Sequence, residues 1–504
     1  MTIRPILVLA PALIAAAALS PSVFAQQVPE IGYVFPSGAQ AGSTIDVVLG
    51  GYDWTPDVDL FVRDSRISLQ LTGKPGPVIV PEPPYWFEKK ARRSPFLLPR
   101  ETAATLSIPS DVPPGVYQWH VANANGVSKH GYFAVSAANT VEVIEDRNRR
   151  IPQLIESLPA TVSGQILKIQ EVDRYRFTAE RTGPMTCSTL AAKIGSVLNA
   201  VLEVRDSTGR VVADGADTEG RDLDVTFAAK AGEQYIVSVF DADFRGNRAF
   251  VYRLALKPGP RVLAVIPASL KHGETRDVTL VGYGVATGSS EVETTTRSVT
   301  APTDSGLSEF VWPFESGPGE SVPVRFLLND LPDQTEAELS KKAASASGVE
   351  LTVPQAVTGV LTERYGQDVF HLTGAKGDVW SIAVQADAIG SALDVSLVIV
   401  DESDRELKRI DDLPGTTDAG IEFTVPADGV YRLLVSDTSG RSGSLDAIYR
   451  LSVQQAEPGY TLSIPERLSL PIGGTAQLAV KAETAWLRRP DSRPTVRPPG
   501  WHDH

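Results

Sequence analysis

The side chains that could do chemistry are the histidines, one cysteine and several pairs of carboxylates. The histidines are His120, His130, His272, His371, His502 and His504. No two of them lie three or four residues apart, the spacing that puts two metal ligands on one helix face. Cys187 lacks a nucleophile motif, and we interpret it as a small buried side chain. The chain also lacks zinc-protease, serine-hydrolase and phosphate-loop motifs. We therefore expect no catalytic residue, no metal, no cofactor and no enzyme activity; a Ser-His-Asp triad assembled from distant segments stays an alternative.

Four pairs of neighbouring carboxylates occur in segments that have the composition of turns. They are Asp57/Asp59, Asp222/Asp224, Asp241/Asp243 and Asp411/Asp412. Calcium takes six to eight oxygen ligands, so such loops could contribute to a site. Acidic turns between strands also arise from turn propensity and solubility alone, and we prefer that interpretation.

The strongest candidate for binding is the aromatic run Tyr85, Trp86 and Phe87, which follows Pro81, Pro83 and Pro84. Prolines exclude a central strand and favour an extended loop. Three consecutive aromatic side chains on such a loop cannot all point inwards. Exposed rings suit stacking on a sugar or a protein contact; alternatively, the loop folds back and caps its own domain.

The composition limits compartment and partners. Arg4, the apolar run 6–19 and Val23-Phe24-Ala25 predict an export signal cut after Ala25. No later stretch reaches the ~20 apolar residues that span a bilayer. We therefore expect a secreted, periplasmic or cell-surface protein without membrane insertion. The net charge of −14 in 504 residues argues against nucleic acid as a partner.

Strands must position these side chains, because one segment of the chain occurs twice and shows the alternation that is typical of strands. The segment Asp173–Leu256 returns: Asp173 as Asp368, Gly195-Ser196 as Gly390-Ser391 and Asp206 as Asp401, each 195 residues later, and Tyr252-Arg253-Leu254 as Tyr449-Arg450-Leu451, after a slip of two residues. A fixed period indicates a duplicated unit. Tyr252, Leu254 and Leu256 alternate with residues that we expect to face water.

A second sequence pattern also recurs. It consists of a short strand, a turn and a strand that ends on glycine. It runs from Val34-Phe35-Pro36 to Gly51-Tyr52 and returns from Val265-Ile266-Pro267 to Gly282-Tyr283. A third copy begins at Ser463-Ile464-Pro465 but is not completed, so we expect residues 463–480 to be poorly packed or to borrow a sheet edge from copy two of the duplicated unit. Strands of this kind predict an immunoglobulin-like sandwich.

The chain is therefore predicted to be all-β, a tandem of immunoglobulin-like and jelly-roll-like β-sandwich domains, with short helical pieces only near residues 145–157 and 334–345. The expected layout is a signal peptide (1–25), an immunoglobulin-like domain with the aromatic insertion (26–137), copy one of the duplicated unit (138–258), a second immunoglobulin-like segment (259–345), copy two (346–455), the start of a truncated third (456–483) and a disordered, basic or out-of-frame tail (484–504).

The duplicated unit resembles the bacterial pre-peptidase C-terminal domain. Copy two matches that family's motifs at Asp368, Phe370, Gly390-Ser391, Leu393-Asp394, Asp401, Asp428-Gly429, Tyr431, Asp437 and Tyr449-Arg450-Leu451. Copy one has Asn199 for the family's aspartate and Glu233-Gln234-Tyr235 where Gly-x-Tyr is usual. The immunoglobulin-like segments look like those of large exported proteins of planctomycete-type bacteria.

The resemblance implies a non-catalytic module that is appended to secreted enzymes, often peptidases. Some family members bind calcium at an acidic start that contains Pro-Asn-Asp, which copy one has lost from Glu142–Asn148 and copy two lacks altogether. These departures leave calcium binding open. We expect an exported binding or adhesion protein, or the accessory part of a larger secreted protein, with an unknown protein or glycan partner at the cell surface. The alternatives are a fragment of a secreted hydrolase and a carbohydrate-binding protein.

Overall fold

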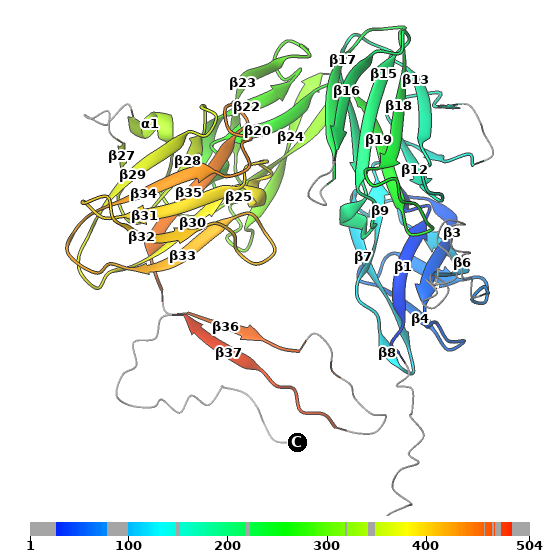
Figure 1. The fold of residues 1–504 in the computed structure, drawn as a ribbon, viewed down its shortest axis with the longest axis horizontal. Coiled ribbons are helices and arrows are strands. Elements are labelled where there is room, and N and C mark those ends of the chain that lie inside the picture. Colours follow the sequence, from blue (N-terminus) through cyan, green and yellow to red (C-terminus); the bar gives the residue numbers. More distant parts are fainter. Residues whose placement is uncertain are drawn as a thin grey trace, which may run out of the picture. The chain divides into compact units, whose positions relative to one another are not determined.

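The structure is a computed structural model, and it describes residues 27–77, 99–147, 152–216, 222–317, 320–340, 348–457, 459–465, 468 and 475–485. The chain forms two compact units. The first comprises Met1–Phe177, Cys187–Val225 and Tyr235–Leu256, and the second comprises Thr178–Thr186, Thr226–Gln234 and Lys257–His504. Within the described part, nearly all regular structure is strand, which confirms the all-β prediction (Figure 1).

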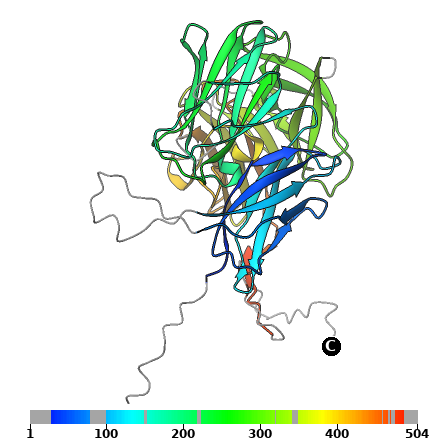
Figure 2. The same cartoon turned by 90° about the vertical axis from the view of Figure 1, so that its right-hand side faces the viewer.

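Sandwich 1 begins the first unit with two sheets. One sheet has the order β1(Glu30–Phe35), β3(Thr44–Tyr52), β6(Arg100–Ser107), β5(Ser68–Leu71). The other has the order β2(Gly38–Gln40), β9(Gly131–Ser136), β7(Gly115–Asn123), β4(Asp59–Val62), with β8(Gly126–Val127) beside β7. Figure 2 shows these strands, blue to cyan, from a second direction. Leu49 and Leu106 from one sheet pack against Trp119 and Phe133 from the other, which closes the core.

Sandwich 2 follows with two five-stranded sheets. One has the order β10(Val141–Ile144), β12(Ala160–Gln165), β19(Val251–Pro258), β14(Gly183–Leu190), β17(Asp224–Ala229). The other has the order β11(Gln153–Leu154), β13(Asp173–Thr178), β18(Gln234–Asp241), β15(Ala200–Asp206), β16(Val211–Ala216). The 3-10 helix η2(Ala192–Ile194) links β14 to β15. Cys187 on β14 is fully buried, as expected, and burial raises its pKa to about 12.

Sandwich 3, in the second unit, has two three-stranded sheets. Their orders are β20(Arg261–Ile266), β22(Thr275–Tyr283), β23(Val292–Thr300) and β21(Ser269–Leu270), β25(Glu320–Leu328), β24(Glu309–Gly317). Strands β20 and β22 pair as β1 and β3 do, and the register shifts at the same place, between Val262 and Ala264 as between Ile31 and Tyr33. The described residues of sandwich 3 include no counterparts of the edge strands β4 and β5.

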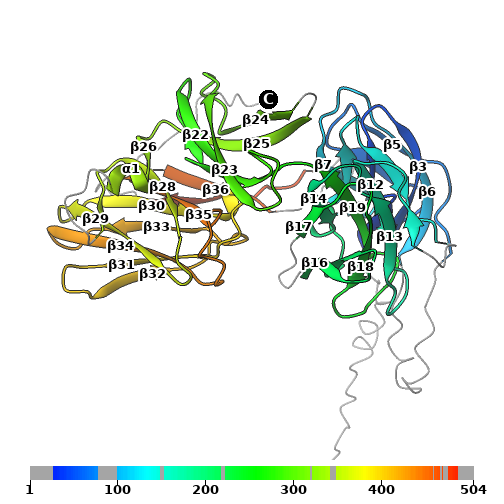
Figure 3. The same ribbon diagram turned by 90° about the horizontal axis from the view of Figure 1, so that it is seen from above.

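Sandwich 4 repeats the strand order of sandwich 2. One sheet has the order β26(Asp333–Thr335), β28(Gln355–Val360), β35(Ile448–Gln455), β30(Val379–Gln385), β33(Ala419–Thr424). The other has the order β27(Val349–Glu350), β29(Gln367–Gly374), β34(Gly429–Asp437), β31(Val395–Val400), β32(Glu406–Ile410). The helices α1(Glu336–Ser340) and η3(Asp387–Ile389) lie in the connections. Figure 3 shows the two layers of this sandwich.

The last described strands, β36(Gly459–Ser463) and β37(Lys481–Ala485), pair only with each other. The side chains described between Leu462 and Ala482 are all exposed, including the apolar Ile464, Leu478 and Val480. A two-stranded ribbon has no opposite sheet to bury an apolar face. The expectation that residues 463–480 are poorly packed is met in this described part.

Two expectations are wrong. The described residues between 145 and 157 contain β11 and no helix, because their backbone pairs in parallel with β13. In addition, the neighbours of the core residues on β19 and β35 do not all face water. Arg253 is 3% exposed and Arg450 is 5% exposed. Each arginine reaches a preceding sandwich, Arg253 at Ser136 on β9 and Arg450 at Ser269 on β21. The preceding sandwich covers this face of the sheet and excludes water from it. The alternation of the sequence alone had assigned the face to solvent.

Candidate functional site

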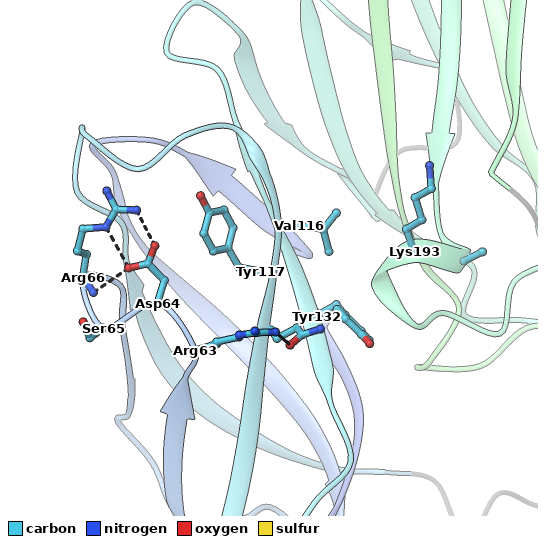
Figure 4. A pocket seen from close by; sticks show the side chains of 10 residues that line it. Arg63, Asp64, Ser65, Arg66, Val116, Tyr117, Tyr132 and Lys193 are labelled. Atoms are coloured by element: carbon cyan, nitrogen blue, oxygen red, sulfur yellow. Dashed lines mark hydrogen bonds and ion pairs between the residues drawn. The ribbon is translucent and has the colours of Figure 1, made fainter. Parts of the chain in front are cut away.

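A hollow of about 930 Å³ lies in the first unit, between the segment 63–66 that follows β4, the strands β7 and β9, and the helix η2. Its lining residues are Arg63, Asp64, Ser65, Arg66, Val116, Tyr117, Gln118, Tyr132, Ala192 and Lys193. We call this site the basic hollow. Figure 4 shows that Lys193 comes from η2, across from Arg63, Arg66 and Tyr117 of sandwich 1.

The strand alternation of β7 positions one side of the basic hollow. Trp119 and Val121 point into the core and are fully buried. Val116, Gln118 and His120 therefore lie on the opposite face of the strand, where they are partly exposed. Inward apolar residues thus hold a polar, solvent-facing surface in place.

Arg66 is neutralised by two carboxylates at the rim of the basic hollow. It donates to Asp64 from Nε at 3.0 Å and from Nη2 at 2.6 Å, and from Nη1 to Asp111 Oδ2 at 3.2 Å. The side-chain hydrogen bond from Arg66 lowers the pKa of Asp64, so this carboxylate stays ionised. Arg66 therefore has little charge left to offer a ligand.

Arg63 and Lys193 have no carboxylate partner among the described residues. Arg63 donates from Nη1 to the Gln118 amide oxygen at 3.0 Å, which orients the guanidinium along the sheet. A guanidinium carries five N–H donors and an ammonium carries three, so most of their donors remain available. In a chain with a net charge of −14, these two cations make the hollow locally basic.

Asp222 fixes the helix that carries Lys193. Its carboxylate accepts the backbone N–H of Ala191 at 2.5 Å, of Ala192 at 2.9 Å and of Lys193 at 3.3 Å. Ile194 is buried against sandwich 1, and Gly195 ends the helix with a left-handed φ of 77°. Because Ile194 and the backbone of η2 are anchored in this way, the Lys193 side chain projects to solvent.

A row of four rings runs beside the basic hollow. Phe61 on β4 is 53% exposed and lies directly opposite His120 on β7. The ring centroids of His120 and His130 are 4.6 Å apart, and those of His130 and Tyr132 are 6.3 Å apart. Tyr132 belongs both to this ring row and to the lining of the hollow. Rings and cations therefore share one continuous surface.

The sequence did not identify this site. Arg63, Gln118, Tyr132 and Lys193 come from four separate segments, and only the fold brings them together. One signal was available, because the alternation in β7 already placed Val116 and Gln118 away from the core. The predicted binding residues Tyr85, Trp86 and Phe87 lie outside the described residues, and their role stays a prediction.

In each of the four carboxylate pairs, at least one carboxylate accepts a hydrogen bond from the protein. Asp57 accepts the N–H of Ala124, Asp241 accepts those of Asn199 and Arg245, and Asp411 accepts the hydroxyl of Ser396. Within the described residues, no group of three or more His, Cys, Asp or Glu side chains is arranged to hold a metal ion.

The two copies share a hydrogen bond from a tyrosine to an aspartate, and neither residue of the pair lines the basic hollow. Tyr252 donates to Asp173 Oδ2 at 2.7 Å, and Tyr449 donates to Asp368 Oδ2 at 2.6 Å. Burial, followed by the nearby Glu145, raises the pKa of Asp173 to about 8. Burial also raises the pKa of Asp368. Asp173 is buried and Asp368 is half-buried, each is hydrogen-bonded within its own sandwich, and neither lines the hollow.

One histidine is paired with a carboxylate, but the pair does not extend to a serine. His272 bonds through Nδ1 to Asp330 at 2.9 Å and through Nε2 to the backbone oxygen of Leu307 at 2.9 Å. Both ring nitrogens are therefore engaged, and neither faces a nucleophile.

No described helix is long and apolar enough to cross a membrane.

No protein-family model and no curated protein matches the chain. The pre-peptidase C-terminal domain of collagenase from Bacillus anthracis is similar over 22% of this chain and 99% of its own length, with 18% identity and a TM-score of 0.19. Tripeptidyl peptidase 2 is similar over 92% of this chain, which spans only 37% of that protein, with 10% identity and a TM-score of 0.16.

A further similar structure is SGBP-B of the Bacteroides ovatus mixed-linkage glucan utilization locus, solved with a mixed-linkage heptasaccharide. It covers 83% of this chain and 72% of its own, with 10% identity and a TM-score of 0.13. These TM-scores are 0.19 or lower, so the similarities carry no argument about ligand or activity.

Proposed function

We propose that this chain is an exported, non-catalytic binding protein in which immunoglobulin-like sandwiches alternate with sandwiches of the pre-peptidase C-terminal type. The motifs of the duplicated unit and the repeated strand order of sandwiches 2 and 4 support that assignment. The sequence motifs of hydrolases are absent, and His272 is engaged at both nitrogens. Sandwiches 1 and 3 repeat one pairing pattern, which fits a chain built by duplicating a pair of domains.

The observation that carries the binding role is the ring row beside the basic hollow. A sugar presents C–H groups on its faces and hydroxyls at its edges, so it is bound by flat rings together with polar groups in the same plane. Phe61, His120 and Tyr132 offer rings, and the Gln118 amide offers a donor for hydroxyls. We therefore assign the outward face of strands β4, β7 and β9 as the binding surface for a glycan at the cell surface.

A glycan screen with the full mature chain tests this assignment. We expect binding to at least one polysaccharide, and a loss of affinity of about tenfold in Tyr132→Ala or Phe61→Ala, because one stacked ring contributes roughly 1–1.5 kcal/mol. Tyr365→Ala is the matched control, since Tyr365 is 69% exposed and belongs to sandwich 4. Binding that survives both ring substitutions, or no glycan binding at all, would reject the proposed surface.

A further inference from the structure

The basic hollow carries charge that a neutral sugar does not need. Its lining has three cations, Arg63, Arg66 and Lys193, against the single carboxylate of Asp64. Asp64 and Asp111 are both committed to Arg66. The charges of Arg63 and Lys193 are therefore left uncompensated within the described residues, on a protein that is otherwise acidic.

Arg63 is held in an orientation suited to an oxyanion. The Gln118 amide oxygen accepts a hydrogen bond from Nη1 of Arg63, and the backbone N–H of Arg63 donates to the Gln118 carbonyl at 2.9 Å. The backbone and the guanidinium of Arg63 are therefore both fixed to β7. A guanidinium fixed in this way loses little entropy on binding and presents its remaining N–H groups as a planar fork.

Lys193 supplies a second cation from a different element. Its helix is anchored by three hydrogen bonds to Asp222 and by buried Ile194, so the position of its backbone is set independently of β4 and β7. Figure 4 shows Lys193 on the η2 side and Arg63 beside Tyr132 on the strand side. A ligand that spans the hollow meets one cation on each side and a ring next to one of them.

We propose that the basic hollow recognises the anionic substituent of an acidic glycan, a uronic-acid carboxylate or a sulfate ester, through Arg63 and Lys193 while Tyr132 contacts the sugar ring. The inference rests on the proposed function and adds the class of its ligand. A nucleic acid also carries oxyanions, but the net charge of −14 repels an extended polyanion away from this one basic site.

Titration of the full mature chain with four polysaccharides tests the proposal. They are a polyuronate, the same polymer with its carboxyls reduced to alcohols, a sulfated glycan and a neutral glucan. We expect the polyuronate or the sulfated glycan to bind at least about tenfold more tightly than the reduced polymer, with an affinity that falls as salt rises. Binding of only one of the two acidic polymers identifies carboxylate or sulfate as the natural substituent.

Arg63→Gln and Lys193→Gln keep hydrogen-bonding capacity and remove one charge each. We expect each to weaken acidic-glycan binding about tenfold and to flatten its salt dependence. The matched controls are Arg174→Gln and Lys408→Gln, whose exposed side chains do not line the hollow.

The outcomes separate this inference from the proposed function. Equal binding of the polyuronate and its reduced form, unaffected by either substitution, overturns the acidic ligand but retains a glycan site. Absence of all glycan binding overturns both. Binding of a single-stranded oligonucleotide as tightly as the best glycan overturns the inference, because the hollow would then be a general polyanion site.

Discussion

Arg253 Nη2 donates to Glu142 Oε1 at 2.6 Å, with the arginine side chain 3% exposed and the glutamate 23% exposed. Arg450 occupies the same motif position in sandwich 4 and meets Asp333, whose side chain is only 1% exposed. Both arginines also hydrogen-bond a serine of a preceding sandwich, Ser136 or Ser269. The Tyr-Arg-Leu motif of each copy therefore joins neighbouring sandwiches within a unit through one buried cation.

Replacing Arg450 by methionine should destabilise sandwich 4 more than Arg253→Met destabilises sandwich 2. Loss of Arg450 removes the cation that contacts the buried Asp333 carboxylate and leaves only the more distant charge of Arg276, at a cost of about 3–5 kcal/mol, whereas Glu142 is partly hydrated. Burial already raises the pKa of Asp333 despite the arginine. Hydrogen–deuterium exchange in urea, read on peptides of sandwiches 2 and 4, measures both variants. Asp333→Asn added to Arg450→Met should recover part of the loss; an equal loss in the two single variants would contradict the prediction.

The stability of sandwich 2 should decrease as the pH rises from about 4 to about 8. The folded-state pKa of Asp173 is raised to about 8 by burial and by Glu145, whereas an unfolded aspartate titrates near 3.9. The folded state therefore binds the extra proton, so the stabilisation is complete below the unfolded pKa and is lost as pH rises through the folded pKa. Asp173→Asn should flatten this dependence in urea midpoints measured at pH 5, 7 and 9. Asp243→Asn, at an exposed carboxylate, is the control and should leave the slope unchanged.

The stability of sandwich 3 should decrease as the pH rises above about 6.5. The hydrogen bond to Asp330, and then that to the Leu307 carbonyl, raises the pKa of His272 above 6.5. The stabilisation is therefore complete below pH 6.5 and is lost as the pH rises through the raised folded value. His272→Gln should remove this component, as should Asp330→Asn. Nuclear magnetic resonance titration of the imidazole gives the pKa directly, and a value at or below 6.5 would refute the prediction.

Gly38→Ala should destabilise sandwich 1 by about 1–3 kcal/mol through overpacking. A Cβ at Gly38 would lie 2.1 Å from the Ala134 backbone oxygen and 2.9 Å from Arg253 Nη1. Gly115→Ala in the same sheet is the control, because the nearest atom to its Cβ is Tyr117 Cε2 at 3.8 Å. Thermal unfolding compares the two variants. If both variants lower the midpoint equally, crowding against Ala134 and Arg253 is not the reason for a glycine at position 38.

The sequence by itself determined the all-β class and the duplication. Alternation with period two is a local property, and Asp173, Tyr252 and their counterparts recur because the same hydrogen bond, from tyrosine to aspartate, is built in each copy. The burial of Cys187 also followed from its residue type and surroundings.

Only the tertiary structure decided which surfaces meet. Alternation assigned Arg253 and Arg450 to solvent, but a preceding sandwich covers them, and that contact depends on packing between distant segments. The basic hollow has the same origin. Arg63, Gln118, Tyr132 and Lys193 have no common spacing, since the pairing of β4, β7 and β9 and the anchoring of η2 by Asp222 set their positions. A period in the sequence encodes one element at a time, whereas a site that several elements share is encoded only in how they pack.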